Sequence, residues 1–239
     1  TVISLPSIIL YRGPSEIDGR PIVAIATVGS RNAKTGPMVQ TWIHYNDRRN
    51  RSAHEIRTLG PDSSVCGSCP RRPLLARNSA ITPCYVSAYS FGAWSKFTRN
   101  RRAAKAWRHP SVLPALKRAA ADHGLRIGSY GDPAAVPASV WSEVIETLQP
   151  VKLTGYTHQW AALSPARAAQ FRGWLMASVD SSAEAAEARD AGWRYFAAVP
   201  DAQSAPAGAI LCPATRPGSD VKCEDCGACD GTRRGDRKP

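Results

Sequence analysis

The second half of the chain alternates between short apolar runs and segments of helical length, and this alternation limits the fold more than any other feature. The segments between the apolar runs carry helix signals, such as Ser164 followed by Pro165, the usual order at a helix start. Short strands joined by helices indicate a parallel sheet. The strands predicted from this pattern are residues 125–130, 151–156, 175–179 and 193–199.

Less regular parts of the chain raise the predicted strand count to eight. Residues 111–124 are predicted to form a helix that stops at Gly124. Eight strands are the number in a closed (β/α)8 barrel. Because the link between the first two strands is too short for a crossover helix, we expect a small, irregular α/β barrel of the TIM-like (β/α)8 type, with an open doubly wound sheet as the alternative. The added strands are residues 21–27, 38–45, 83–88 and 209–212.

The charge of the chain is concentrated in its first half. The 239 residues carry a formal net charge of +12, and residues 1–120 hold 19 Lys or Arg against 5 Asp or Glu. Such a concentrated excess favours a polyanionic partner, above all DNA, without excluding RNA. Residues 94–109 interleave cations with Trp94, Phe97 and Trp107, which predicts phosphate contacts and base stacking; a basic helix with a buried aromatic side is the alternative. The cations of this segment are Lys96, Arg99, Arg101, Arg102, Lys105 and Arg108.

Seven cysteines fall into two groups, and their spacing indicates metal thiolates in a reducing compartment. The late group predicts a structural zinc site made of four cysteines, with an iron–sulfur cluster as the alternative. The early group, Cys66, Cys69 and Cys84, has three ligands. It predicts either a second zinc completed by His54 or an acid, or a cluster with one open iron; unpaired buried cysteines are the third interpretation. The late group consists of Cys212, Cys223, Cys226 and Cys229.

Polar residues follow the predicted strands at their carboxyl ends, where parallel α/β folds bind ligands. Asp132 and Asp180 each follow such a strand and are the candidate catalytic residues. Each of these carboxylates also precedes a predicted helix, so helix capping is the alternative role. The candidate substrate-binding residues at the same edge are Asn32, Tyr156, His158 and Trp160.

Several stretches together resemble one group of bacteriophage proteins. These are YRGPSEIDGRPIVAIAT, CGSCP with PCYV, GSYGDPAAVP, GYTHQW, SVDS and the terminal CxxCxxC. Over residues 11–231 the chain is similar to compact phage relatives of the guanine transglycosylases, which include enzymes that place 7-deazaguanines into DNA. The resemblance implies an irregular barrel with zinc near its last strands. The chain departs from the family in two features: its expected zinc site is made of cysteine only, and it has the early cysteine trio.

The same resemblance implies a pentosyltransferase that exchanges bases. An Asp carboxylate would attack the anomeric carbon of a deoxyguanosine, guanine would leave, and a 7-deazaguanine such as preQ0 would displace the carboxylate. Asp180 is then the expected nucleophile and Asp132 the base or recognition group, although the roles can be reversed. A base flipped out of a duplex suits a cationic surface beside a pocket.

Two other functions compete with base exchange. One is a redox or radical enzyme with an iron–sulfur cluster on the early trio, and the other is a non-catalytic zinc protein that binds nucleic acid. No apolar run is long enough to span a membrane and no secretion signal is evident, so we expect a cytoplasmic protein. One catalytic domain is expected over residues 1–231, with a flexible basic tail over residues 232–239.

Overall fold

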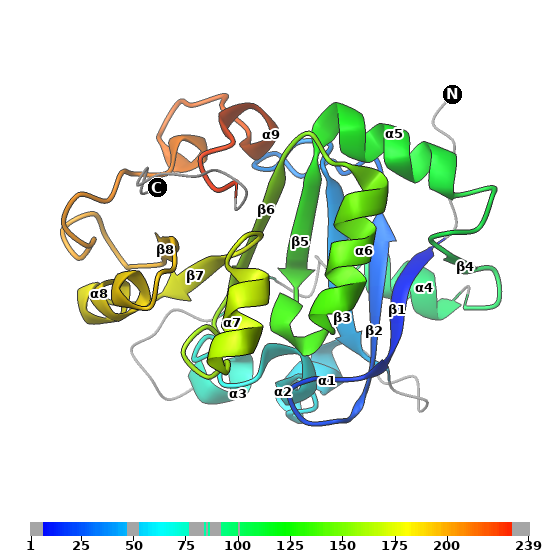
Figure 1. Ribbon diagram of the computed structural model, residues 1–239, viewed down its shortest axis with the longest axis horizontal. Coiled ribbons are helices and arrows are strands. Elements are labelled where there is room, and N and C mark those ends of the chain that lie inside the picture. Colours follow the sequence, from blue (N-terminus) through cyan, green and yellow to red (C-terminus); the bar gives the residue numbers. More distant parts are fainter. Residues whose placement is uncertain are drawn as a thin grey trace.

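The computed structural model describes residues 7–46, 53–76, 84, 86, 92–99 and 101–230. Within them the chain forms a mixed α/β fold around a sheet of eight strands in the order β4-β1-β2-β3-β5-β6-β7-β8 (Figure 1). The strands are β1 (Ile8–Pro14), β2 (Pro21–Thr27), β3 (Val39–Tyr45), β4 (Lys105–Ala106), β5 (Leu125–Tyr130), β6 (Leu153–Thr157), β7 (Met176–Val179) and β8 (Tyr195–Ala197).

Helices connect the parallel strands and surround the carboxyl end of the sheet. In Figure 1, α6 and α7 lie in front of the sheet and α2 and α3 lie below it, on the side to which β5 points. The helices are α1 (Ala53–Thr58), α2 (Ser63–Cys66), α3 (Pro73–Ala76), α4 (Gly92–Arg99), α5 (Leu113–His123), α6 (Ala138–Leu148), α7 (Pro165–Phe171), α8 (Ser182–Asp190) and α9 (Cys223–Cys226), with 3-10 turns η2 (Pro133–Ala135) and η3 (Pro213–Thr215).

Strand direction divides the sheet into two parts. β2 runs antiparallel to both β1 and β3, whereas β3, β5, β6, β7 and β8 run parallel to one another. The carboxyl end of β2 therefore lies at the amino edge of the parallel strands. The loops that follow β5, β6 and β7 share the opposite, carboxyl edge.

The mostly parallel α/β sheet is confirmed, but a closed barrel is not seen. In the described residues the strand order has two ends, β4 and β8, and no pairing between them is present. Residues 209–212, predicted as a strand, form irregular backbone with Ile210 and Leu211 half exposed. Without that strand, the second half of the chain supplies only β5 to β8. The predicted strand 83–88 lies outside the described residues except for Cys84 and Val86.

Local signals set the helix starts on this sheet. The Ser164 hydroxyl accepts from the Arg167 amide at the start of α7, and Ser181 accepts from the Glu184 amide at the start of α8. The Glu184 carboxylate accepts in turn from the Asp180 amide, which satisfies one more unpaired helix-start donor. Gly124, at a φ of 86°, follows α5 and turns the chain into β5.

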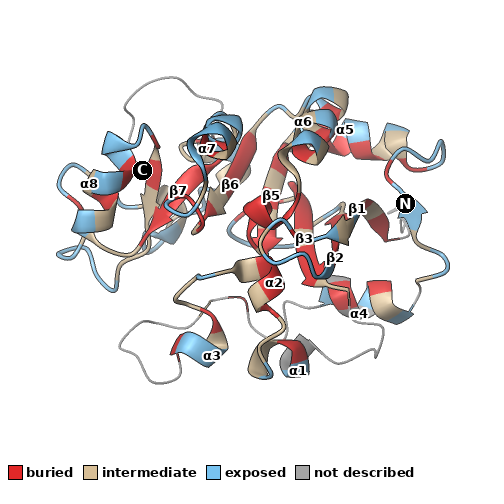
Figure 2. Ribbon diagram, turned by 60° about the horizontal axis from the view of Figure 1, so that its bottom comes forward, coloured by how far each residue is buried: buried red, intermediate tan, exposed pale blue. Residues whose placement is uncertain are grey.

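The core lies along both faces of the central strands (Figure 2). β2 and β7 are buried along almost their whole length, as expected of strands covered on both sides. Trp141 of α6 is fully buried and its indole N–H donates to the Pro133 carbonyl at 2.9 Å, so the helix is fixed to the loop after β5. The core thus holds the carboxyl ends of β5 and β6 at defined positions.

Candidate functional site at the carboxyl edge of the sheet

Asp132 follows β5 and is buried, and both oxygens of its carboxylate accept hydrogen bonds. Its Oδ1 accepts from the Ala134 amide at 2.9 Å and from the Thr157 hydroxyl at 2.7 Å, and its Oδ2 accepts from the His158 amide at 2.8 Å. Burial raises the pKa of Asp132, although these hydrogen bonds oppose the shift. The side chain caps the 3-10 turn η2 and ties the end of β5 to the end of β6.

Asp180, which follows β7, forms an ion pair with an arginine that the sequence analysis had assigned to no site. The Arg71 Nε and Nη2 lie 2.8 and 2.6 Å from Asp180 Oδ1, and Nη2 also donates to the Ala198 carbonyl. Burial would raise the pKa of Asp180, but hydrogen bonds from His158 and Arg71 outweigh burial and lower it. Asp180 is therefore an ionised partner held by a cation from the loop between α2 and α3.

His158, directly after β6, lies between Asp180 and the early cysteines. Its Nε2 is 3.5 Å from Asp180 Oδ2 and 3.1 Å from Ser178 Oγ. Its ring also hydrogen-bonds with the Cys69 thiol. Burial would lower the pKa of His158, but the bonds to Asp180 and Cys69 raise it to about 10, so the imidazole carries a positive charge near neutral pH.

Cys66, Cys69 and Cys84 gather at the same edge and are half-buried. Burial raises the pKa of Cys66, and the negative charges of Cys69, Asp62 and Cys84 raise it further, so the three sulfurs share one environment. The Cys69 amide donates to the Cys66 carbonyl at 3.1 Å, and the Cys84 amide donates to the Arg71 carbonyl at 2.7 Å. These bonds bring the distant third cysteine to the Cys66–Cys69 turn.

Arg72 and Gln159 hold the loop that carries the first two thiols. Arg72 Nη2 pairs with the buried Asp62 at 2.7 Å and donates to the Gly60 carbonyl, while Nη1 donates to the Gly67 carbonyl. Gln159 Nε2 donates to the Cys66 carbonyl at 3.1 Å. Gly67 has a φ of 54°, and a Cβ there would lie 2.4 Å from the Gln159 side chain, so only glycine fits between Cys66 and Cys69.

Three of the predicted substrate-binding residues lie away from this site. Asn32 is on the loop after β2, at the amino edge, because β2 is antiparallel, and its Oδ1 accepts from the amides of Lys34 and Thr35. Tyr156 points to the other cysteine group, where its hydroxyl hydrogen-bonds with Cys229. Trp160 is buried and donates to the Ser178 carbonyl, which is a packing role. Of the expected set, only His158 stands with Asp132 and Asp180.

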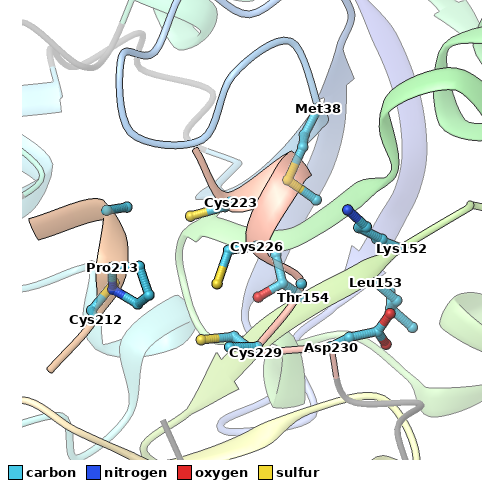
Figure 3. A pocket seen from close by; sticks show the side chains of 13 residues that line it. Met38, Lys152, Leu153, Thr154, Cys212, Pro213, Cys223, Cys226, Cys229 and Asp230 are labelled. Carbon is cyan, nitrogen blue, oxygen red and sulfur yellow. The ribbon is translucent and has the colours of Figure 1, made fainter. Parts of the chain in front are cut away.

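The late cysteines line one pocket at the amino edge of the parallel strands. In Figure 3 the sulfurs of Cys223, Cys226 and Cys229 point to the side on which the turn at Cys212 and Pro213 lies. Burial raises the pKa of Cys229 to about 11, while the hydrogen bond from Tyr156 opposes the shift. In the part of the chain that is described, no three His, Cys, Asp or Glu side chains are close enough to surround a single metal ion, so the zinc site stays a prediction.

The basic segment 94–109 forms α4, a turn and the short strand β4, and its aromatic side chains belong to the core. Trp94, Phe97 and Trp107 are at most 5% exposed, and Trp94 stacks on the buried His44 with ring centroids 4.4 Å apart. The prediction that these rings stack on bases is therefore wrong, because the segment has a buried aromatic side. Contact between its cations and phosphates stays a prediction. The side chains that remain exposed are Lys96, Arg99, Arg102, Lys105 and Arg108.

Other cations of the segment and its neighbours have partners inside the protein. Arg101 lies over the Trp94 and Phe97 rings, at 5.6 and 5.5 Å from their centroids, and is half-buried. Arg108 pairs with Glu143 of α6.

His54, the fourth ligand considered for the early trio, is in α1, and its side chain lies outside the described structure.

Sequence reasoning missed Arg71, Ser178, Thr157 and Gln159, which complete the carboxyl-edge site. Arg71 and Arg72 follow a proline, and an RR pair in this position resembles an exposed basic run. In the structure each arginine pairs with a carboxylate inside the protein, Arg71 with Asp180 and Arg72 with Asp62. Asp180 is distant in sequence and Asp62 belongs to no motif, so neither pairing could be recognised beforehand. The position of Ser178 and Thr157 on the last residues of β7 and β6 was the available signal.

Comparison of the chain with known protein families, curated proteins and solved structures finds no match. Among the described helices, none has the length and apolar character needed to cross a membrane. A function is therefore inferred from the geometry of the two cysteine-bearing regions and from the charge of the surface. The fold and the site together define an α/β protein with a thiol-rich carboxyl edge.

Proposed function

We propose that the protein is an iron–sulfur enzyme of the redox or radical type that acts on nucleic acid or its components, with its working cluster on Cys66, Cys69 and Cys84. One observation carries the proposal: the fold brings three thiols from two separated segments to the carboxyl edge of a parallel sheet, beside His158, while the other four cysteines line a different pocket. Three thiolates leave one iron of a four-iron cluster without a protein thiolate.

The donor set fits such a group better than it fits zinc. Structural zinc is usually enclosed by four protein ligands. Among the histidines whose side chains are described, His158 is the one that contacts the trio, and it is already engaged by Asp180 and Ser178. When bound, a cluster with an open iron supplies one-electron chemistry and a place for an exogenous ligand.

The chain's own residues orient this edge. Arg72 and Gln159 fix the backbone of the Cys66–Cys69 turn through its carbonyls. Arg71 and His158 place two cationic groups beside the thiols and Asp180 holds both of them, which offsets the negative charge that three thiolates would gather. Asp132 fixes the His158 backbone from the opposite side.

Nucleic acid is the proposed partner because exposed cations gather along α4, the turn after it and the edge strand β4. Lys96, Arg99, Arg102 and Lys105 contribute to this basic surface. Affinity for DNA or RNA should fall steeply as salt rises, because each neutralised phosphate releases counterions. A binding constant that does not change with salt would contradict this part of the proposal.

Base exchange receives less support from the geometry. A nucleophilic carboxylate needs an oxygen free to attack. Both Asp132 oxygens accept hydrogen bonds, which disfavours Asp132 as the nucleophile. Asp180 Oδ1 accepts two N–H groups of Arg71, so Asp180 Oδ2, 3.5 Å from His158 Nε2, is the oxygen left for attack. Base exchange stays a prediction, and incubation of the protein with DNA and labelled preQ0 tests it. Incorporation of label that is lost in Asp180→Ala would establish exchange in place of cluster chemistry.

The cluster proposal is tested in a variant that lacks the late cysteines. With Cys212, Cys223, Cys226 and Cys229 changed to Ala, anaerobically purified protein should contain about four iron and four sulfide per chain. Changing Cys69→Ala in that background should remove them. The reduced cluster should give an electron paramagnetic resonance spectrum that changes when S-adenosylmethionine or a nucleotide is added. Zinc without iron at this site would overturn the proposal.

A further inference from the structure

The late cysteines supply a three-plus-one ligand set. Cys223, Cys226 and Cys229 follow one another at two-residue gaps on α9 and the turn after it, and Gly227, at a φ of 58°, reverses the chain between the second and the third. The fourth, Cys212, comes from a separate loop and is followed by Pro213. All four line the same pocket.

This arrangement differs from that of common structural zinc sites. Structural zinc sites usually combine two ligand pairs, each pair on its own turn. Three cysteines at C-x2-C-x2-C spacing, with a fourth Cys-Pro from elsewhere in the chain, are the ligand pattern of ferredoxin-type [4Fe–4S] clusters. The C-x2-C-x2-C spacing and the Cys212–Pro213 turn are separate features, and each of them favours a [4Fe–4S] cluster over zinc.

The segment is held in place by the protein without the help of an ion. Arg194 donates to the carbonyls of Ala228 and Asp230, and Lys152 donates to the carbonyls of Glu224 and Asp225. The Cys223 amide donates to the Lys34 carbonyl at 2.9 Å. Because five backbone groups of the segment are bonded to distant parts of the chain, a metal is not required to tie it down, which was the role expected of structural zinc.

The surroundings of the four sulfurs also suit a cluster. The pocket wall is largely apolar, with Met38, Leu153 and Ala214 in it, and a shell of this kind limits solvent access to bound iron and sulfide. Arg126 and Lys34 place positive charges near Cys223. Apolar walls with cationic groups behind them set the potential of iron–sulfur centres.

Strand β6 connects this pocket to the carboxyl edge. Tyr156 hydrogen-bonds with Cys229 on one side, and His158, two residues later, bonds with Cys69 on the other. Three consecutive residues therefore connect a thiol of one group with a thiol of the other. A purely structural ion gains nothing from this proximity, whereas a redox centre does.

We propose that Cys212, Cys223, Cys226 and Cys229 bind a [4Fe–4S] cluster, fully ligated by cysteine, that acts as a one-electron carrier. When bound, the cluster would take up one electron from an external one-electron reductant and pass it to a one-electron acceptor, and no bond to the protein would be made or broken. The cluster itself does not depend on the function proposed for the early trio; only its role as electron donor to that trio rests on it.

The test uses a variant in which Cys66, Cys69 and Cys84 are changed to Ala, so that the late cysteines are the only thiols. Purified without oxygen from cells supplied with iron and zinc, it should contain about four iron and four sulfide per chain. Dithionite should bleach its brown colour and produce the resonance signal of a reduced cluster. One zinc per chain and no iron would overturn the inference.

Two further variants protect the test against misfolding. Cys212→Ser, made in the variant without the early trio, removes a single ligand of the late site and should lower iron from about four per chain to almost none after exposure to air, with an unchanged circular dichroism spectrum. Arg172→Ala, a surface change away from the cysteines, should keep all the iron. Unchanged iron content in Cys212→Ser would contradict the assignment.

The outcomes for the two sites can be told apart. Iron in the variant without the early trio, and none in the variant without the late cysteines, would leave this inference standing and defeat the proposed function. The reverse pattern would defeat this inference alone. Iron in neither variant would overturn both.

Discussion

The two cysteine-bearing regions of the molecule are held by different kinds of contact. At the carboxyl edge, charged side chains bind one another: Arg71 pairs with Asp180, Asp180 with His158, and Arg72 with Asp62. In the C-terminal segment the cations Lys152 and Arg194 bind backbone carbonyls instead. The first arrangement leaves ionised groups beside the thiols, where they can influence a reaction. The second uses its charges to position the chain and leaves the sulfurs as the reactive groups.

The largest effect is expected from the ion pair at the carboxyl edge. Both partners are mostly buried, with side-chain exposures of 18% for Arg71 and 12% for Asp180. Arg71→Ala should lower the free energy of unfolding by about 3 kcal/mol, because it leaves the carboxylate buried without its cation. A double-mutant cycle with Asp180→Ala in urea should give a coupling energy of about 1.5–3 kcal/mol.

The pair of Arg20 and Asp18 is the matched control for this cycle. It is 3.9 Å long and its arginine is 59% exposed, so its coupling should be at most about 0.5 kcal/mol. Equal coupling energies in the two ion pairs would show that burial does not strengthen the pair at the carboxyl edge.

A pH-dependent effect of intermediate size is expected at the carboxyl end of β3. His44 is buried between Trp94 and Tyr130, and burial lowers its pKa from 6.5 to about 3. Because the unfolded chain binds a proton that the folded chain does not, the His44 contribution is fully present above pH 6.5 and is lost as pH falls toward 3. Between pH 7 and 5 this loss should reach about 2 kcal/mol.

Urea unfolding at both pH values measures this loss. His44→Phe keeps an aromatic ring in the stack and should remove most of the dependence. A wild-type protein whose stability does not change between pH 7 and 5 would contradict the buried, neutral imidazole.

The smallest global effect is expected in the C-terminal segment. Arg194→Ala removes the bonds to the carbonyls of Ala228 and Asp230 and should lower the global free energy of unfolding by only about 1 kcal/mol. Local opening should increase more than global unfolding, because the segment lies outside the main core. Limited proteolysis should therefore cleave near α9 well before the sheet unfolds.

Arg172→Ala is the control for this experiment. The Arg172 guanidinium also donates to a backbone carbonyl, that of Ala191, but on an exposed surface away from α9. It should leave the protease sensitivity of the C-terminal segment unchanged. Equal cleavage in both variants would mean that Arg194 does not fasten the segment.

Elements whose signals are local could be predicted from the amino-acid sequence. β5 and β2 occupy the residues predicted for them, and α7 begins directly after Ser164, as the helix-start signal indicated. The sequence also indicated that Asp132 and Asp180 lie at one edge of a parallel sheet, because each follows a strand directly. Hydrophobic period and capping act over a few residues, so a single sequence contains them.

Strand direction, the ends of the sheet and the partners of the charged groups became known only from the folded structure. β2 could not be recognised as antiparallel from its own residues, and its direction moved Asn32 to the opposite edge. The pairing of Arg71 with Asp180 joins residues 109 positions apart. Contacts of this kind depend on which buried surfaces pack together, and no local pattern in the chain records that choice.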